Sequence, residues 1–239
     1  MTPELMLRKA ARARTPAARA KYARRGLDAS RLDRDTRAML LRQLYLSLME
    51  RRDFSGARRV GEEMATLEVL PDVAHQDVAR ACLGEGDLDG ATRHLRLALR
   101  HGPPSRRAFH FWTLGSILYL HGHPEEAVRA LSSAARWGTT EKPLYRAQLA
   151  LARIEAGLTS SSLLELRQRL EQAPCGQGYG RYVLGEICIH LSDKPAAEAY
   201  FTEFLRRTTG GRVALAVALG AEIRRARRHL AALRRQRRR

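Results

Sequence analysis

Three groups of side chains have types and spacings that could carry out chemistry. His110, His121 and His123 could meet on a metal ion, but no acidic residue has the spacing of a further ligand. The glycine-rich run 176–181 opens a predicted helix and could receive a phosphate, yet no strand precedes it and a turn explains its glycines. No nucleophile is paired with a base at a supporting spacing. The sequence therefore predicts no enzyme, no metal site and no cofactor.

The third group consists of three cysteines, Cys82, Cys175 and Cys188. Their number is odd and no two form a Cys-x-x-Cys pair, so a disulfide framework or a cysteine zinc site has little support. The N-terminal residues contain no secretory apolar region, and the apolar stretch 213–221 is far shorter than the ~20 residues that cross a bilayer. We therefore expect free thiols in a reducing compartment and a cytoplasmic location.

Positive charge is concentrated at the two ends of the chain. The net charge is +18, of which residues 1–34 carry +7 and residues 212–239 carry +9, because the latter hold ten arginines and one acid. Residues 35–211 hold 23 basic and 21 acidic side chains and are nearly neutral. The sequence thus indicates a nearly neutral body with a basic segment at each end.

The basic C-terminal segment is a candidate binding element. Its candidate contact residues are Arg224, Arg225, Arg227, Arg228, Arg234, Arg235, Arg237, Arg238 and Arg239. Accessible guanidinium groups could engage an acidic partner or the phosphates of a nucleic acid, although no aromatic side chain there could stack on bases. A solvated helix without a partner is an equal alternative.

A repeat of about 35 residues positions all of these groups. Small residues recur at Ala57, Ala91, Ala127, Ser162 and Ala197, separated by 34, 36, 35 and 35 residues. Apolar residues elsewhere in each repeat recur at separations of three and four, the spacing of one helical face. A fixed period of this length is typical of a stacked array, in which each repeat buries its apolar face against the next.

Each repeat is expected to contain two antiparallel helices. We predict five repeats, at 38–71, 72–105, 108–141, 143–176 and 178–211. Asp, Thr or Ser in the turn between helices can cap the second helix, Gly there can end the first, and prolines separate the repeats. Ala, Leu and Arg are abundant and favour helix, so the predicted fold class is all-α.

The repeat is similar to the tetratricopeptide repeat family. Repeat three reads Phe111-x-x-Leu114-Gly115 and then Ala127, and repeat five reads Leu184-Gly185, then Ala197 and Phe201. Repeat four departs from the pattern, because Arg153 and Arg169 occupy slots that are normally apolar and Ser162 replaces Ala. This departure predicts a shifted register or loosened packing there. The resemblance implies a right-handed α-solenoid of helix pairs.

The resemblance also implies a groove lined by the first helix of each repeat. The groove positions are Arg42, Gln76, Arg80, Phe109, Trp112, Thr113, Ser116, Tyr119, Gln148, Tyr179, Tyr182 and Glu186. Exposed aromatic side chains at these positions could anchor a partner segment, and Trp112 and Tyr182 are the preferred anchors. Packing between repeats is the alternative explanation for the others.

The chain ends complete the predicted architecture. Residues 1–37 are expected to form a basic helical segment that resembles a degenerate repeat, and residues 212–239 a long capping helix with an arginine-rich tail. The apolar start of that helix could also support homo-oligomerisation. The preferred function is a non-enzymatic scaffold or adaptor that binds a protein segment in its groove. The alternative is a nucleic-acid-associated protein that binds phosphates through its basic ends.

Overall fold

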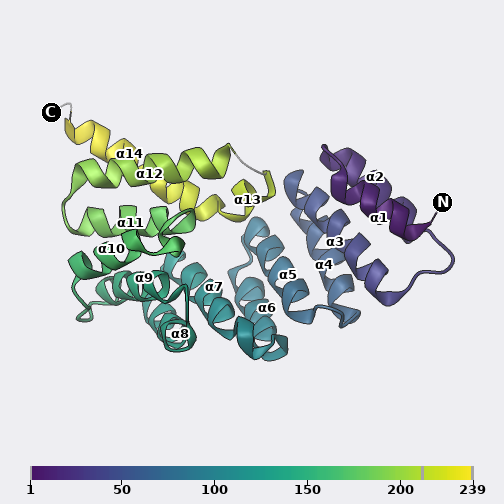
Figure 1. Ribbon diagram of the computed structural model, residues 1–239, viewed down its shortest axis with the longest axis horizontal. Helices are drawn as coiled ribbons and strands as arrows, with labels where there is room; N and C mark the ends of the chain where they lie inside the picture. Colours follow the sequence, from purple (N-terminus) through teal and green to yellow (C-terminus); the bar gives the residue numbers. More distant parts are fainter. Residues whose placement is uncertain (1, 211–212, 238–239) are drawn as a thin grey trace. The chain divides into compact units, whose positions relative to one another are not determined.

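The protein is all-α, as predicted. The structure is a computed structural model that describes residues 2–210 and 213–237, and every regular element in these ranges is a helix (Figure 1). The chain divides into two compact units, residues 1–103 and residues 104–239. The arrangement within each unit follows from the two-helix repeat.

The N-terminal unit consists of six helices. These are α1 (Pro3–Arg12), α2 (Pro16–Leu27), α3 (Arg34–Glu50), α4 (Phe54–Thr66), α5 (Pro71–Glu85) and α6 (Leu88–His101). Each helix packs against its neighbours in sequence, and α1 also packs against α3. The first helices of the first two pairs therefore lie side by side.

The C-terminal unit continues with three more helix pairs. Its elements are the short 3-10 turns η1 (Pro104–Arg106) and η2 (Pro174–Gly176), and helices α7 (Arg107–Leu120), α8 (Pro124–Trp137), α9 (Lys142–Glu155), α10 (Leu163–Gln172), α11 (Tyr179–His190), α12 (Lys194–Thr209), α13 (Val213–Ala218) and α14 (Gly220–Arg237). Helix α14 packs against both α11 and α12, beside which it runs in Figure 1.

The turns within the pairs use the expected capping chemistry. The carboxylates of Asp53, Asp87 and Asp193 accept hydrogen bonds from backbone N–H groups of the first turn of α4, α6 and α12. Gly86 follows α5, and Gly122 lies two residues after the end of α7; their left-handed φ values are 82° and 80°. These caps fix where each pair turns.

Small residues allow the helices of a pair to approach closely. Ala57, Ala91, Ala127 and Ala197 are completely buried. A Cβ added at Gly185 would lie 2.6 Å from the ring of Phe201 on the partner helix. These residues therefore serve packing rather than ligand binding.

Repeat four is irregular, as expected, whereas the prediction of a single long C-terminal helix is wrong. Ser162 does not occupy the buried crossing position, because it is exposed and caps α10, so the first helical turn of the second helix in repeat four is missing. The run 159–162 is Thr-Ser-Ser-Ser, whose hydroxyl groups compete for backbone hydrogen bonds, and Arg153 Nε donates to the Thr159 carbonyl at 2.6 Å. The single long C-terminal helix is likewise divided into α13 and α14 beside Gly220, a poor helix former.

Candidate partner-binding face

The predicted groove residues of the C-terminal unit lie on α7, α9 and α11. Trp112 Nε1 and Ser116 Oγ both donate to Gln148 Oε1, at 2.7 and 3.0 Å, and so join α7 to α9. The rings of Trp112 and Tyr179 meet edge to face with centroids 5.0 Å apart, which joins α7 to α11. The structure thus brings first-helix residues of three repeats together on one face.

Helix α14 occupies this face through an ion-pair network. Glu186 on α11 is 2% exposed, and its Oε2 accepts from Arg225 Nε at 3.0 Å. Its Oε1 lies 3.1 Å from His229 Nε2. Arg225 also reaches Glu155 on α9 at 2.6 Å. One arginine of α14 therefore binds carboxylates from two first helices.

Tyr119 completes the network from α7. Its hydroxyl donates to Glu186 Oε2 at 3.3 Å and accepts from Arg225 Nη2 at 2.9 Å, while the Arg225 guanidinium lies 4.8 Å from the ring centroid. Burial raises the pKa of Glu186, but the hydrogen bond from His229 and the charge of Arg225 outweigh it, so the pKa is lowered overall. Glu186 is thus held as a buried carboxylate.

A second buried acid comes from α14 itself. Glu222 is 7% exposed, and its Oε1 accepts from the Tyr179 hydroxyl at 3.3 Å. Burial raises the pKa of Glu222 to about 7, because Tyr179 and the charge of Arg224 compensate only in part. Glu222 was not among the predicted site residues, although it is the only acid in the sequence of residues 212–239 and is isolated there among arginines.

The expected exposure is wrong for half of the groove residues. Tyr119 and Tyr182 are each 1% exposed, because α14 and α12 pack over them. Gln76, Ser116, Gln148 and Glu186 are buried as well. Phe109 is exposed, while Arg42, Arg80, Trp112, Thr113 and Tyr179 are partly exposed. Tyr182 therefore cannot be a surface anchor in this conformation, whereas Trp112 still can.

In the N-terminal unit, the corresponding face is held by charges from its own helices. Asp77 on α5 is 2% exposed and accepts from Arg42 Nε of α3 at 3.4 Å and from Arg80 Nη1 at 2.9 Å. The Tyr45 hydroxyl donates to the Asp77 carbonyl at 2.7 Å. Burial raises the pKa of Asp77, and the two arginines offset only part of that rise. Arg42 and Arg80 therefore already have an intramolecular acceptor.

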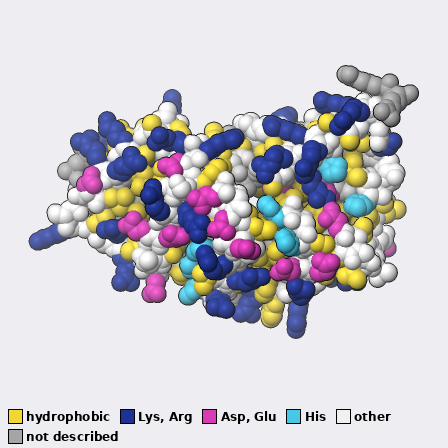
Figure 2. Space-filling view, turned by 180° about the vertical axis from the view of Figure 1, so that it is seen from behind, with side chains coloured by type: hydrophobic (Ala, Val, Ile, Leu, Met, Phe, Trp, Pro, Cys, Tyr) yellow, Lys and Arg dark blue, Asp and Glu magenta, His cyan; other side chains and the backbone are white. Residues whose placement is uncertain are grey.

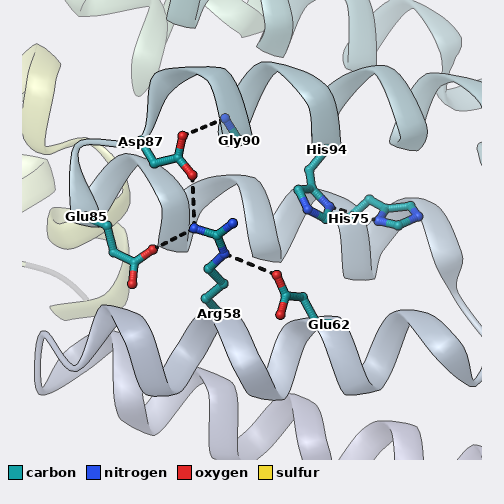
Figure 3. Close-up of polar contacts among 7 residues, drawn as sticks. All are labelled: Arg58, Glu62, His75, Glu85, Asp87, Gly90 and His94. Atoms are coloured by element: carbon teal, nitrogen blue, oxygen red, sulfur yellow. Dashed lines mark hydrogen bonds and ion pairs between the residues drawn. The ribbon is translucent and has the colours of Figure 1, made fainter.

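A second polar cluster joins α4, α5 and α6 (Figure 3). Arg58 on α4 donates from Nη1 to Glu85 and Asp87, at 3.1 and 2.9 Å, and from Nε to Glu62. Asp87 also caps α6 at the Gly90 N–H, so Arg58 ties one pair to the cap of the next. These contacts are structural, because every acid in the cluster is satisfied within the array.

Figure 3 also shows a histidine pair between α5 and α6. The Nδ1 atoms of His75 and His94 lie 3.2 Å apart, so one nitrogen must carry a proton and the other must accept it. Burial lowers the pKa of both rings, and for His75 the nearby His94 adds to the effect. Both rings are therefore held neutral near pH 7.

The basic C-terminal segment is only partly available. Arg224, Arg227, Arg228 and Arg235 are exposed, and Arg234 is exposed with Nε 3.8 Å from Glu198. Arg225 was expected to be accessible, and this is wrong because it binds Glu155 and Glu186. The side chain of Arg237 and residues Arg238 and Arg239 lie outside the described part.

Figure 2 shows Lys and Arg side chains interspersed with acidic ones over much of one face, in keeping with the nearly neutral body.

The chemical groups singled out in the sequence do not converge. His110 is buried in the first turn of α7, whereas His121 and His123 follow its end, ~16 Å away at 1.5 Å per residue. Within residues 2–210 and 213–237, no cluster of three or more His, Cys, Asp or Glu side chains is arranged to hold a metal. The three cysteines are free thiols.

Two of the three glycines in 176–181 serve close packing, and the third, Gly178, has a left-handed φ of 63°. A Cβ added at Gly176 would lie 1.9 Å from the Leu170 carbonyl oxygen, and one at Gly180 would lie 2.2 Å from that of Cys175. The turn between α10 and α11 requires glycine at both positions.

In the described part of the chain, no helix is both long and apolar enough to cross a membrane.

Comparisons with known proteins identify the fold. The C-terminal part of a TPR repeat-containing protein from Cytophaga hutchinsonii matches over 97% of this chain and 93% of its own, with a TM-score of 0.55 and 12% identity. PilF from Pseudomonas aeruginosa matches over 85% of this chain and 91% of its own, with a TM-score of 0.52 and 19% identity. No protein-family model and no curated protein matches the sequence.

These likenesses place the chain among proteins with the tetratricopeptide-repeat fold, as the repeat pattern predicted. At this level of identity they establish the fold alone, and the function has to be argued from this chain's own residues.

Proposed function

We propose that this chain is a non-enzymatic, cytoplasmic scaffold that binds a helix of a partner protein on the face formed by α7, α9 and α11. One observation carries the proposal: this face already receives a helix, α14, through Arg225 and His229. These two residues are four positions apart and so lie on one side of that helix. The recognised feature is a helix that presents such a basic pair to Glu155 and Glu186.

In this proposal α14 is an intramolecular occupant of the face. A partner helix of the same character would compete with α14, and the competition would decide when the face is available. The partly exposed ring of Trp112 contacts Tyr179 and the exposed ring of Phe109, and these two rings on the N-terminal part of α7 would extend the contact.

The test uses a labelled synthetic peptide of residues 220–237, added to the intact chain. The Arg225→Ala chain should bind this peptide more tightly than the parent chain, because its own α14 is loosened while Glu155 and Glu186 remain. The control peptide carries Arg225→Ala and should bind weakly to both chains. Equal binding of both peptides to both chains would contradict the proposal.

A second candidate is nucleic-acid binding through α14. Arg224, Arg227 and Arg228 are exposed at separations of three and four residues and so share one side of the helix. Replacing all three with Ala should abolish salt-sensitive retention on immobilised single-stranded DNA. No retention of the parent chain at low salt would remove this candidate.

Homo-oligomerisation stays a third proposal, supported by the exposure of Val213 and Leu215 on α13.

A further inference from the structure

An open, basic cleft lies between α8, α9 and α10, where repeats three and four meet. The cleft has a volume of about 590 Å³, within the range of ligand-binding sites. Five cationic side chains and one acid line it: Arg136, Lys142, Arg146, Arg153, Arg169 and Glu165. The floor is apolar and includes Leu149 and Leu166.

Two of these arginines stand where the other repeats bury apolar residues. The positions equivalent to Arg153 hold Leu48, Cys82, Leu118 and Cys188, and those equivalent to Arg169 hold Met64, Ala98, Ala134 and Phe204, all buried. Repeat four thus has an arginine at two positions where the other repeats have a buried apolar side chain. Both arginines, Arg153 and Arg169, line the same cleft. A break of this kind in an otherwise consistent pattern is expected at functional sites.

The cleft lies where the backbone also departs from the repeat. Repeat four lacks the first turn of its second helix, and Ser161 from this non-helical segment lines the cleft. Arg153 Nε donates to the Thr159 carbonyl, which holds the segment in its non-helical course. The missing turn and the two arginines therefore belong to one local arrangement.

The positive charge of the cleft is not balanced within the described chain. Arg136, Lys142 and Arg146 form no ion pair with any described residue, and Glu165 lies 4.0 Å from Arg169 Nη2. Five cations against one acid, grouped around an apolar floor, attract an anionic ligand that also has an apolar portion.

We propose that this cleft binds an acidic peptide segment in which carboxylate side chains flank an aliphatic residue. The aliphatic residue would lie on Leu149 and Leu166, and the carboxylates would pair with the surrounding cations. No aromatic side chain lines the cleft, so stacking of nucleic-acid bases has no platform there. The cleft shares no residue with the α14 network, and the inference is independent of the proposed function.

The test measures binding of a fluorescein-labelled peptide, Glu-Glu-Leu-Glu-Glu-Leu-Glu-Glu, to the intact chain by fluorescence anisotropy. Arg153→Leu with Arg169→Ala restores residue types that other repeats carry at these positions. This variant should keep or gain thermal stability and weaken peptide binding about tenfold or more. Arg146→Glu, which changes an exposed side chain, should weaken binding without affecting the fold.

The matched control is Arg227→Leu with Arg228→Ala on α14, which removes the same charge outside the cleft. It should leave peptide binding within about twofold of the parent, as should Arg225→Ala, which disturbs only the proposed function. A peptide with Gln in place of Glu should not bind.

Three results would overturn the inference. They are no binding of the acidic peptide at low salt, an equal loss in the control variant, and equally tight binding of a single-stranded RNA of the same charge that depends on the same arginines. The last result would assign the cleft to nucleic acid.

Discussion

Asp77 in the N-terminal unit and Glu186 in the C-terminal unit are both buried carboxylates on the first helix of a helix pair. Asp77 is balanced by Arg80 on the same helix and by Arg42 on α3, in the preceding helix pair. Glu186 is balanced by Arg225 and His229, about 40 residues later in sequence, on α14. The partners of Asp77 come from helices of the repeats themselves, whereas those of Glu186 depend on the docking of the separate helix α14.

The pKa directions of the two acids follow from this difference. Burial dominates at Asp77 and its pKa is raised, whereas the groups brought by α14 dominate at Glu186 and its pKa is lowered. Helix α14 therefore gives Glu186 more stabilisation than the partly exposed Arg42 gives Asp77. This makes the docking of α14 the interaction to disturb first.

The largest expected effect is that of Arg225→Ala. Loss of this guanidinium leaves Glu186 buried with only His229 and the Tyr119 hydroxyl beside it, which should lower the stability of the α14 contact by about 4 kcal/mol. Hydrogen exchange measured by mass spectrometry should show lost protection across α14 and α11. Arg228→Ala, at an exposed position on the same helix, is the control, and equal deprotection there would refute the assignment.

The next largest effect is the change of folding stability with pH that Glu222 causes. Because its pKa is raised from 4.5 to about 7 on burial, the folded state holds a proton that the unfolded state releases, so stability falls as pH rises between those values. The difference is about 3 kcal/mol. Glu222→Gln should remove this loss, and urea unfolding at pH 5 and pH 8 would measure it. A parent chain equally stable at both values would contradict the prediction.

A smaller effect is expected when each of the two acids, Glu186 and Asp77, is replaced by its neutral amide. Glu186→Gln should destabilise the C-terminal unit by about 2 kcal/mol, because the charged form is favoured there. Asp77→Asn should leave the N-terminal unit within about 1 kcal/mol of the parent, on the more stable side, because its charged form is disfavoured. Thermal unfolding of both variants checks the opposite signs, and destabilisation of similar size in both would show that the two sites are equivalent.

The smallest effect is expected at His75 and His94. Their lowered pKa values mean that the unfolded state takes up protons first, so the N-terminal unit should lose stability as pH falls below about 6.5. Hydrogen exchange of α5 and α6 at pH 5.5 and 7.5 would measure this loss, which His94→Asn should reduce. This pH dependence is opposite in sign to that of Glu222, and an N-terminal unit unaffected by acid would argue against the histidine pair.

Much of the helical architecture was predictable, because the signals for it are local. The caps at Asp53 and Asp87, the left-handed glycines and the buried alanines depend on residues within one helix pair. The packing role of Gly185 was predictable for the same reason, since the repeat itself places Phe201 opposite it. Repeat four was recognised as irregular from Arg153 and Arg169, but the missing turn depends on how residues 159–162 compete for hydrogen bonds.

The candidate binding face was predicted less well, because exposure depends on what covers a helix. Tyr182 and Trp112 occupy comparable first-helix positions, yet one is covered by α12 and the other remains partly exposed. Arg225 and Arg228 are three residues apart on α14 and look alike in the sequence. Only the position of α14 on the array makes Arg225 an internal partner and leaves Arg228 in solvent.

The sequence by itself determined the repeat period, the helices and their caps, because these depend on side-chain periodicity and backbone chemistry within about 35 residues. The tertiary structure alone decided that α14 lies on the face of α7, α9 and α11, that Glu186 and Glu222 are buried, and that five cations of α8, α9 and α10 surround one cleft. These features arise from contacts between separate helices, and no local periodicity encodes them.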